Sequence, residues 1–260
     1  MTKIPAHTGW LWLKEGVGLF RKQPAALTTL LFANILIMAV LGLVPIVGML
    51  LAVLIPSLTI GYMQACLMID NRERVTPAVL MTGFRQPALV RLCKVGLIYL
   101  AVSIVLTLLL HLAVDPAALP QMAPDADPKA VPRVPMSIGS SLAMLVLFTV
   151  NACVLISLSF AAPLTYWQHM GPGKAAFYSF FAVLKNARVF IVLLMSWFGI
   201  LFGIWIVLLL ILGNGRAGLV AMIWTAFLFM LLLQCALYVG YRHIFGKPVV
   251  DGAKPVDLSK

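Results

Sequence analysis

The chain has 260 residues, of which 62% are hydrophobic and only 10% are charged, and its formal net charge is +11. A soluble domain has roughly 45–50% apolar and about 25% charged residues, so this composition excludes a fold whose surface faces water on all sides. The charged residues are also clustered, and long uncharged runs separate them. A helix of about 20 residues crosses the hydrocarbon of a bilayer, and these runs are long enough to do so.

The uncharged runs predict six membrane-spanning helices in an all-α polytopic bundle. A turn at Gly42 to Pro45 divides the first and longest run into two spans. Helices are favoured over barrel strands because the runs are continuously apolar, whereas a membrane strand alternates over about 10 residues. We expect a single transmembrane domain over residues 1–247 and a polar tail over 248–260. The predicted spans are residues 24–43, 46–69, 95–114, 137–167, 189–213 and 217–241.

The distribution of Lys and Arg predicts the orientation, because basic residues near span ends are retained on the cytoplasmic side. With the N-terminus inside, sixteen basic residues lie on the inner side and only Lys129, Arg133 and Arg216 on the outer side. Both termini are therefore expected in the cytoplasm of a bacterial cell, with the protein in its inner membrane. The proline-rich segment 115–136 is expected to be an external loop with little regular structure. No cleavable signal is expected, since the first apolar run leads directly into a second span.

Similar short phrases precede the odd-numbered spans: FRKQPA at 20–25, FRQPA at 84–88 and LKNA at 184–187. They predict three copies of one unit, in which an amphipathic interfacial helix on the cytoplasmic side precedes a span, an outer turn and a second span. In the first copy Trp10, Leu13, Val17 and Phe20 share a helical face, which is expected to lie in the membrane surface. The alternative is convergence, because any inner-membrane protein carries aromatic and basic residues at its interface.

The basic residues of these segments are candidate contacts for lipid headgroups. Each contributes about 1 kcal/mol at an anionic membrane surface. The alternative is that these charges only fix the topology. The candidates are Lys14, Arg21, Lys22, Arg72, Arg74, Arg85, Lys174, Lys185 and Arg188.

Within the predicted spans there is no Asp, Glu, Lys or Arg. Proton-coupled pumps, voltage sensors and most ion-coupled carriers need such groups at membrane depth, so this absence argues against those classes. The amides of Asn34, Asn151 and Gln234 must find polar partners and are expected to face the bundle interior. Pro56 and Pro163 are candidate helix kinks, because an internal proline removes a backbone hydrogen bond. Paired interruptions either bend helices for packing or mark a transport site.

Signatures of catalysis and of metal binding are missing from the sequence. Residues 171–175 (GPGKA) lack the earlier glycine and the following Ser or Thr of a phosphate-binding loop. The four histidines are scattered and the four cysteines make no CxxC pair, so the cysteines are expected to pack as small apolar residues. We expect no enzyme activity, no cofactor and no nucleic-acid partner.

Residues 161–167 (AAPLTYW), 175–179 (AAFYS) and 184–186 (LKN) carry a family resemblance. This pattern resembles uncharacterised bacterial six-span inner-membrane proteins, the BPSS-type membrane proteins. It is more distantly similar to the membrane domain fused to some glycerophosphodiester phosphodiesterases. The resemblance implies a fold and a compartment, and it carries over no catalytic residue, since the phosphodiesterase chemistry of those fusions belongs to a separate soluble domain.

These observations leave two hypotheses. The first is a non-enzymatic inner-membrane protein with a structural, envelope-related or accessory role, which binds anionic phospholipid, a membrane-protein partner or a second copy of itself. The second is a carrier or permease component for a small neutral or amphipathic molecule, with a path near Pro56 and Pro163. Only the carrier hypothesis requires a polar cavity and a second conformation.

Overall fold

The computed structural model describes residues 4–43, 45–86, 88–113, 138–213 and 215–248. Within these ranges every regular element is a helix, and six segments are long and apolar enough to cross a membrane. The predicted all-α fold with six spans is therefore confirmed. The elements are α1 (Thr8–Lys22), α2 (Pro24–Gly42), α3 (Pro45–Asp70), the 3₁₀ helix η1 (Pro77–Phe84), α4 (Ala88–Ala113), α5 (Ile138–Ser157), α6 (Ala161–Trp167), α7 (Pro172–Lys185), α8 (Ala187–Leu212) and α9 (Arg216–Phe245).

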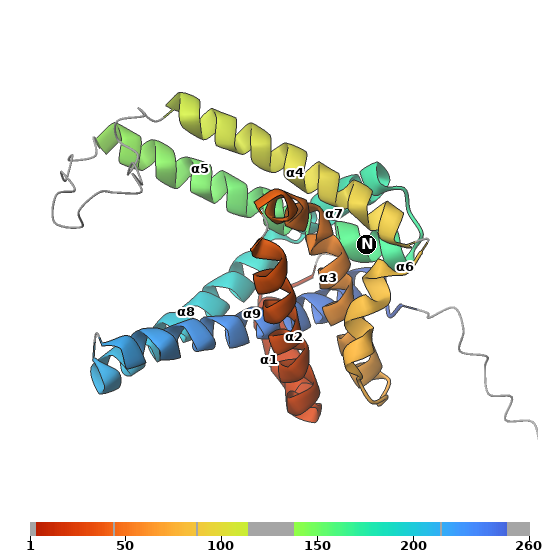
Figure 1. The fold of residues 1–260 in the computed structure, drawn as a ribbon, viewed down its shortest axis with the longest axis horizontal. Helices are drawn as coiled ribbons and strands as arrows, with labels where there is room; N and C mark the ends of the chain where they lie inside the picture. Colours follow the sequence, from red (N-terminus) through yellow and green to blue (C-terminus); the bar gives the residue numbers. More distant parts are fainter. Residues whose placement is uncertain (1–3, 44, 87, 114–137, 214, 249–260) are drawn as a thin grey trace, which may run out of the picture.

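Two helical hairpins, α4 with α5 and α8 with α9, extend from a shared base in diverging directions (Figure 1). Their outer faces are apolar and exposed; on α8, for example, Met195 is 71% and Leu210 80% exposed. Monomeric soluble proteins rarely expose such continuous apolar surface. The apolar outer faces of these hairpins are suited to the hydrocarbon of a membrane.

Helix α1 packs into the centre of the molecule, against α8 and α9. Its buried side includes Gly9, Trp12, Gly16 and Leu19, whereas Trp10 is 47% exposed. The prediction that Trp10 shares the membrane-facing side of α1 with Leu13 is therefore corrected, because Leu13 is buried. The physical reason lies in the glycines: a Cβ on Gly16 would lie 2.7 Å from the backbone nitrogen of Ala236 on α9. Only a residue without a side chain permits that approach.

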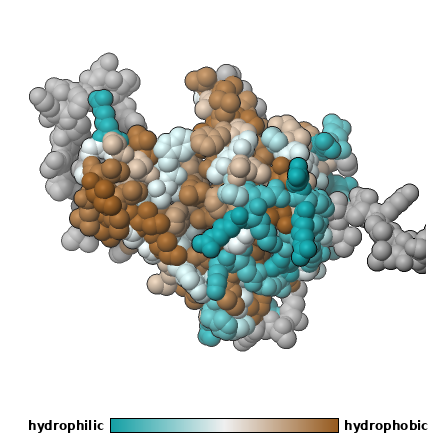
Figure 2. Space-filling view, turned by 90° about the horizontal axis from the view of Figure 1, so that it is seen from below, coloured by the Kyte–Doolittle hydropathy of each residue, from teal (hydrophilic) through white to brown (hydrophobic). Residues whose placement is uncertain are grey.

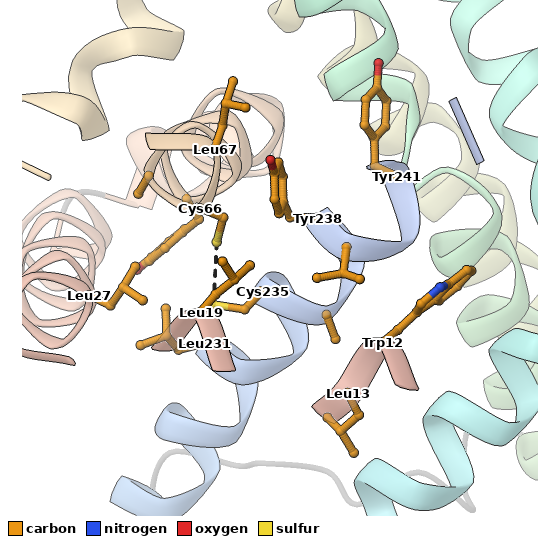
Figure 3. Packing of buried hydrophobic residues seen from close by; sticks show 14 of the residues in the cluster. Trp12, Leu13, Leu19, Leu27, Cys66, Leu67, Leu231, Cys235, Tyr238 and Tyr241 are labelled. Atoms are coloured by element: carbon orange, nitrogen blue, oxygen red, sulfur yellow. Dashed lines mark hydrogen bonds between the residues drawn. The ribbon is translucent and has the colours of Figure 1, made fainter. Parts of the chain in front are cut away.

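The large apolar side chains of the core come from α1, α2, α3, α8 and α9, and Figure 3 shows part of this packing. Trp12 has no exposed surface and packs edge-on against Phe190, with ring centroids 5.5 Å apart. Between α3 and α9 the thiols of Cys66 and Cys235 are buried and lie 3.5 Å apart, sulfur to sulfur. Both thiols are free, and both serve in this contact as small core side chains.

The fourth predicted span, 137–167, is not one continuous helix. It divides into α5 and α6, and the helix is interrupted at residues 158–160. Ser179 of α7 bridges the interruption: its hydroxyl donates to the carbonyl of Ser157 at 2.6 Å and accepts from the N–H of Phe160 at 3.1 Å. Pro163 lies in the first turn of α6, where a missing N–H costs nothing. The break thus precedes Pro163, whereas Pro56 lies inside α3 as expected.

The remaining bounds differ from the predicted spans chiefly at the charged ends. Helix α4 begins at Ala88, so Arg91 and Lys94 belong to its first two turns, and α9 continues to Phe245. The second interfacial element, η1, is a 3₁₀ helix that packs on α3, with Leu80 almost fully buried. The predicted external loop 115–136 and the tail 248–260 lie almost wholly outside the described residues.

Candidate functional site

Hydrophilic side chains gather on part of the face that Figure 2 shows. We call the nine candidate headgroup contacts, together with the helix ends and short helices that carry them, the basic end. It forms where α1, α3 and α9 finish, where α4 and α8 begin, and where η1 and α7 lie. All nine candidates have exposed side chains: Lys14, Arg21, Lys22, Arg72, Arg74, Arg85, Lys174, Lys185 and Arg188.

Gln23 joins two groups of these basic residues. Its amide nitrogen donates to the carbonyl of Glu73 at 2.6 Å, and its amide oxygen accepts from the N–H of Val75 at 3.1 Å. This side chain therefore fixes the junction between α1 and α2 to the loop after α3. It places Arg21 and Lys22 beside the segment that carries Arg72 and Arg74.

A network of charged side chains joins α1, α3 and α9 at the basic end. The guanidinium of Arg242 donates through Nη1 to Asp70 Oδ1 at 2.9 Å and through Nη2 to Glu15 Oε2 at 2.7 Å. Lys247 Nζ lies 3.2 Å from Asp70 Oδ2, and the buried Tyr238 hydroxyl donates to the same oxygen at 3.1 Å. One arginine on α9 thus ties the carboxylates of α1 and α3 together.

This network leaves the basic end with a strong excess of positive charge. The acidic residues in the described ranges are Glu15, Asp70 and Glu73, and the first two are paired with Arg242 and Lys247. Glu73 accepts a hydrogen bond at 3.5 Å from Asn71, a neutral side chain. In the part of the chain that the structure describes, three carboxylates thus face nine exposed basic candidates, and two of these carboxylates are already in ion pairs.

Helix α7 presents aromatic rings to the outside between two lysines. Phe177 is 62% exposed and Phe181 49% exposed, and their ring centroids lie 4.5 Å apart. Lys174 lies 5.8 Å above the centroid of the Tyr178 ring, a cation–π arrangement. The opposite side of α7 is buried through Ala175, Ser179 and other small residues. This arrangement is typical of a helix at a membrane surface.

The three predicted interior amides are all half-buried. The oxygens Asn34 Oδ1 and Gln234 Oε1 are buried and have no hydrogen-bond partner among the described residues. Asn34 is beside Tyr62, whose hydroxyl donates to the carbonyl of Leu30 at 3.4 Å. Asn34, Asn151 and Gln234 lie on α2, α5 and α9.

The pairing of Asp70 and Glu15 with Arg242 is not predictable from the linear sequence, because these residues lie far apart along the chain. Asp70 directly follows a long apolar run, and this position indicates that its charge needs a polar partner. In the described residues no group of three or more His, Cys, Asp or Glu side chains is arranged to hold a metal ion.

Comparison with known proteins identifies the family. The chain is 30% identical over 254 residues to a "probable inner membrane protein" of Burkholderia thailandensis, and the match covers 95% of this chain and 94% of the relative. No protein-family model and no solved structure matches the chain. The comparisons do not extend to the membrane domain fused to phosphodiesterases. The chain, which has six helices long and apolar enough to cross a membrane in its described residues, belongs to the family of this probable inner membrane protein.

Proposed function

We propose that this protein is a non-enzymatic component of the inner membrane that binds anionic phospholipid headgroups at its basic end, in a structural, envelope-related or accessory role. One observation carries the proposal. The nine candidate side chains are exposed, while Glu15 and Asp70 are already engaged by Arg242 and Lys247. Exposed positive charge at the basic end favours an anionic partner.

An anionic membrane surface fits the basic end better than a soluble acidic ligand does. The basic residues lie next to exposed aromatic rings on α7, and those rings prefer the headgroup level of a bilayer. The long apolar helices fix the depth of the molecule, so the basic end meets the headgroups in the predicted orientation. The cytoplasmic leaflet, which carries anionic lipids, would then be the one contacted.

Native mass spectrometry of the purified protein tests the proposal. The spectra compare the retention of phosphatidylglycerol and cardiolipin with that of phosphatidylcholine. The test variant combines Arg21→Gln, Lys22→Gln and Arg85→Gln. At about 1 kcal/mol per basic residue, these changes should lower the preference for anionic lipid by up to roughly a hundredfold.

A matched control removes three positive charges from the predicted outer side, through Lys129→Gln, Arg133→Gln and Arg216→Gln. This variant should keep the lipid preference of the parent. Equal preference in the parent and both variants would refute headgroup binding and leave the basic residues with an orienting role alone. A reporter fused to the C-terminus shows whether each variant keeps its topology. The same spectra report the mass of any second chain, so they also test for a homo-oligomer or a membrane-protein partner.

The second hypothesis, a carrier for a neutral or amphipathic molecule, requires a cavity near Pro56. A cavity lined by Ile55 and Thr59 is present. Its lining determines which ligand it would accept.

A further inference from the structure

A mainly apolar cavity of about 350 Å³ lies where the α4–α5 hairpin diverges from the α8–α9 hairpin (Figure 1). Its volume falls within the range of ligand pockets, roughly 300–1,000 Å³. Helices α3, α4, α5, α8 and α9 contribute to its wall, and every described side chain that lines it is uncharged. We propose that this cavity is a binding site for one acyl chain of a phospholipid, from the leaflet next to the basic end. The site takes up the chain whatever the charge of the headgroup, so it does not depend on the proposed binding of anionic lipid.

The wall of the cavity is suited to hydrocarbon. Leucine and isoleucine side chains form most of it, and each of the five helices contributes at least one of them. These side chains are Ile55, Leu100, Leu155, Ile156, Leu193, Leu194, Leu233 and Leu237. A charged phosphate or carboxylate would lose its hydration there without gaining an ion pair. The lining therefore accepts the apolar part of a lipid and excludes its headgroup.

The polar side chains of the wall offer few hydrogen bonds to a ligand. The hydroxyls of Thr59 and Tyr99 already donate to backbone carbonyls. The atoms Ser159 Oγ and Gln234 Oε1 are buried and present almost no surface to the cavity. Of the described lining, the Ser103 hydroxyl and the Gln234 amide nitrogen remain. A bound water needs about two to four polar partners, so a wall of this kind favours hydrocarbon over water or a polar solute.

The cavity lies at the depth of lipid acyl chains. Leu100 of α4 follows the exposed Lys94 by six residues, and Leu194 of α8 follows the exposed Arg188 by six residues. At 1.5 Å per residue, each separation is about 9 Å along the helix. One leaflet contributes about 15 Å to the hydrocarbon core, so these lining residues belong to the leaflet next to the basic end. A lipid whose headgroup lies beside the basic residues places the upper part of its acyl chains at that depth.

The cavity opens toward the lipid-facing surface of the molecule. Ile55 on α3 and Leu155 on α5 line it and are also 46% and 49% exposed, on segments long and apolar enough to cross a membrane. An acyl chain can therefore enter sideways from the surrounding bilayer. The wall of an empty apolar cavity lacks dispersion contacts, and an acyl chain supplies them. The bound chain thus fills the space between the two hairpins where they diverge.

Photocrosslinking of the full-length protein in nanodiscs tests the proposal. The probe is a phosphatidylcholine with a diazirine near the middle of one acyl chain, and peptide mapping locates the labels. We expect labels on half-buried lining residues such as Leu194 and Leu233, in addition to labels on exposed residues such as Leu210. A lipid that only surrounds the protein reaches the exposed residues alone. Labels confined to exposed residues would overturn the proposal.

Ser103→Phe is designed to fill the cavity from α4. A chain that shares the space with the added ring is overpacked, so labelling at Leu194 and Leu233 should fall about tenfold. Thr107→Phe, one turn further along α4 and outside the cavity lining, is the matched control and should label as the parent does. Unchanged labelling of the lining residues in Ser103→Phe would contradict the site.

Leu155→Trp fills the cavity from α5 and keeps the test decisive if Ser103→Phe does not fold. Its control is Leu145→Trp on the same helix, at a position that is 62% exposed and outside the lining. Labelling at the lining residues should fall in Leu155→Trp and persist in Leu145→Trp. Equal labelling in these two variants would refute the site.

A further variant separates this site from the proposed headgroup binding. The protein with Arg21→Gln, Lys22→Gln and Arg85→Gln should keep the labelling of the cavity by phosphatidylcholine, because the wall contacts the chain alone. Its retention of anionic lipid judges the proposed function independently. Loss of the cavity labelling in this variant would show that the basic residues, and not the apolar wall, hold the lipid, and would overturn the inference.

Discussion

Arg242 and Asp70 are separated by 172 residues, yet they form an ion pair of 2.9 Å that joins α9 to the end of α3. The Asp70 side chain is 13% exposed and that of Arg242 is 26% exposed, so water screens this pair only in part. The second nitrogen of the same guanidinium reaches Glu15 on α1. Three helices that are distant in sequence are thereby fixed at the basic end.

We expect Arg242→Gln to destabilise the protein by about 1–3 kcal/mol, because it leaves Asp70 with a weaker partner. Thermal unfolding of the purified protein in detergent, followed by circular dichroism, measures the change. Arg216→Gln, at the exposed start of α9, is the control and should have little effect. Similar stabilities for the two variants would show that the network adds nothing to the packing of α1, α3 and α9.

The contact between α1 and α9 depends on a glycine, and a neighbouring glycine offers a matched comparison. Gly16→Ala would place a methyl group 2.7 Å from the Ala236 nitrogen, so the helices must separate and the midpoint of unfolding should fall. Gly18→Ala meets no atom within 4 Å and should raise stability by up to about 1 kcal/mol, since alanine favours the helix. Thermal unfolding of both variants checks the pair. Equal effects would contradict the close packing of α1.

Ser179 holds together the interruption between α5 and α6 through two hydrogen bonds. Ser179→Ala leaves the Phe160 N–H and the Ser157 carbonyl without these partners, and should destabilise the protein by about 1–3 kcal/mol. Thermal unfolding of the purified protein in detergent measures the change. Thr107→Ala, which removes an exposed hydroxyl bonded to its own helix, is the control and should change the stability little. Equal effects of the two variants would contradict the bridging role of Ser179.

The predicted orientation is tested by reporter fusions. Fusions at Lys174 and at the C-terminus should report the cytoplasm, and a fusion within residues 126–131 should report the outside. The reason is the retention of Lys and Arg on the inner side. A C-terminus outside the cytoplasm would refute the orientation and, with it, the expected contact between the basic end and the cytoplasmic leaflet.

The spans were predictable because a run of apolar residues of sufficient length is a local property. The runs that contain Leu30, Leu201 and Phe229 mark three of the helices without any knowledge of their neighbours. The clustering of Arg21, Arg74 and Arg188 between runs likewise predicted a basic surface, since charges are excluded from hydrocarbon. Helix ends were less predictable, because α4 and α9 continue past the apolar core through Arg91 and Arg242.

Length, hydropathy and charge along the chain are therefore enough to predict the six spans and the basic residues between them. The buried face of α1 depends on tertiary packing, because Gly9 and Gly16 have no hydrophobic signal and matter only when another backbone approaches them. Tertiary packing also decides that Asp70 meets Arg242, and that Ile55 and Leu155 line one cavity. Such pairings depend on how the hairpins cross, and the period of apolar residues along a lipid-facing helix does not specify the crossing, since lipid and protein interior are similarly apolar.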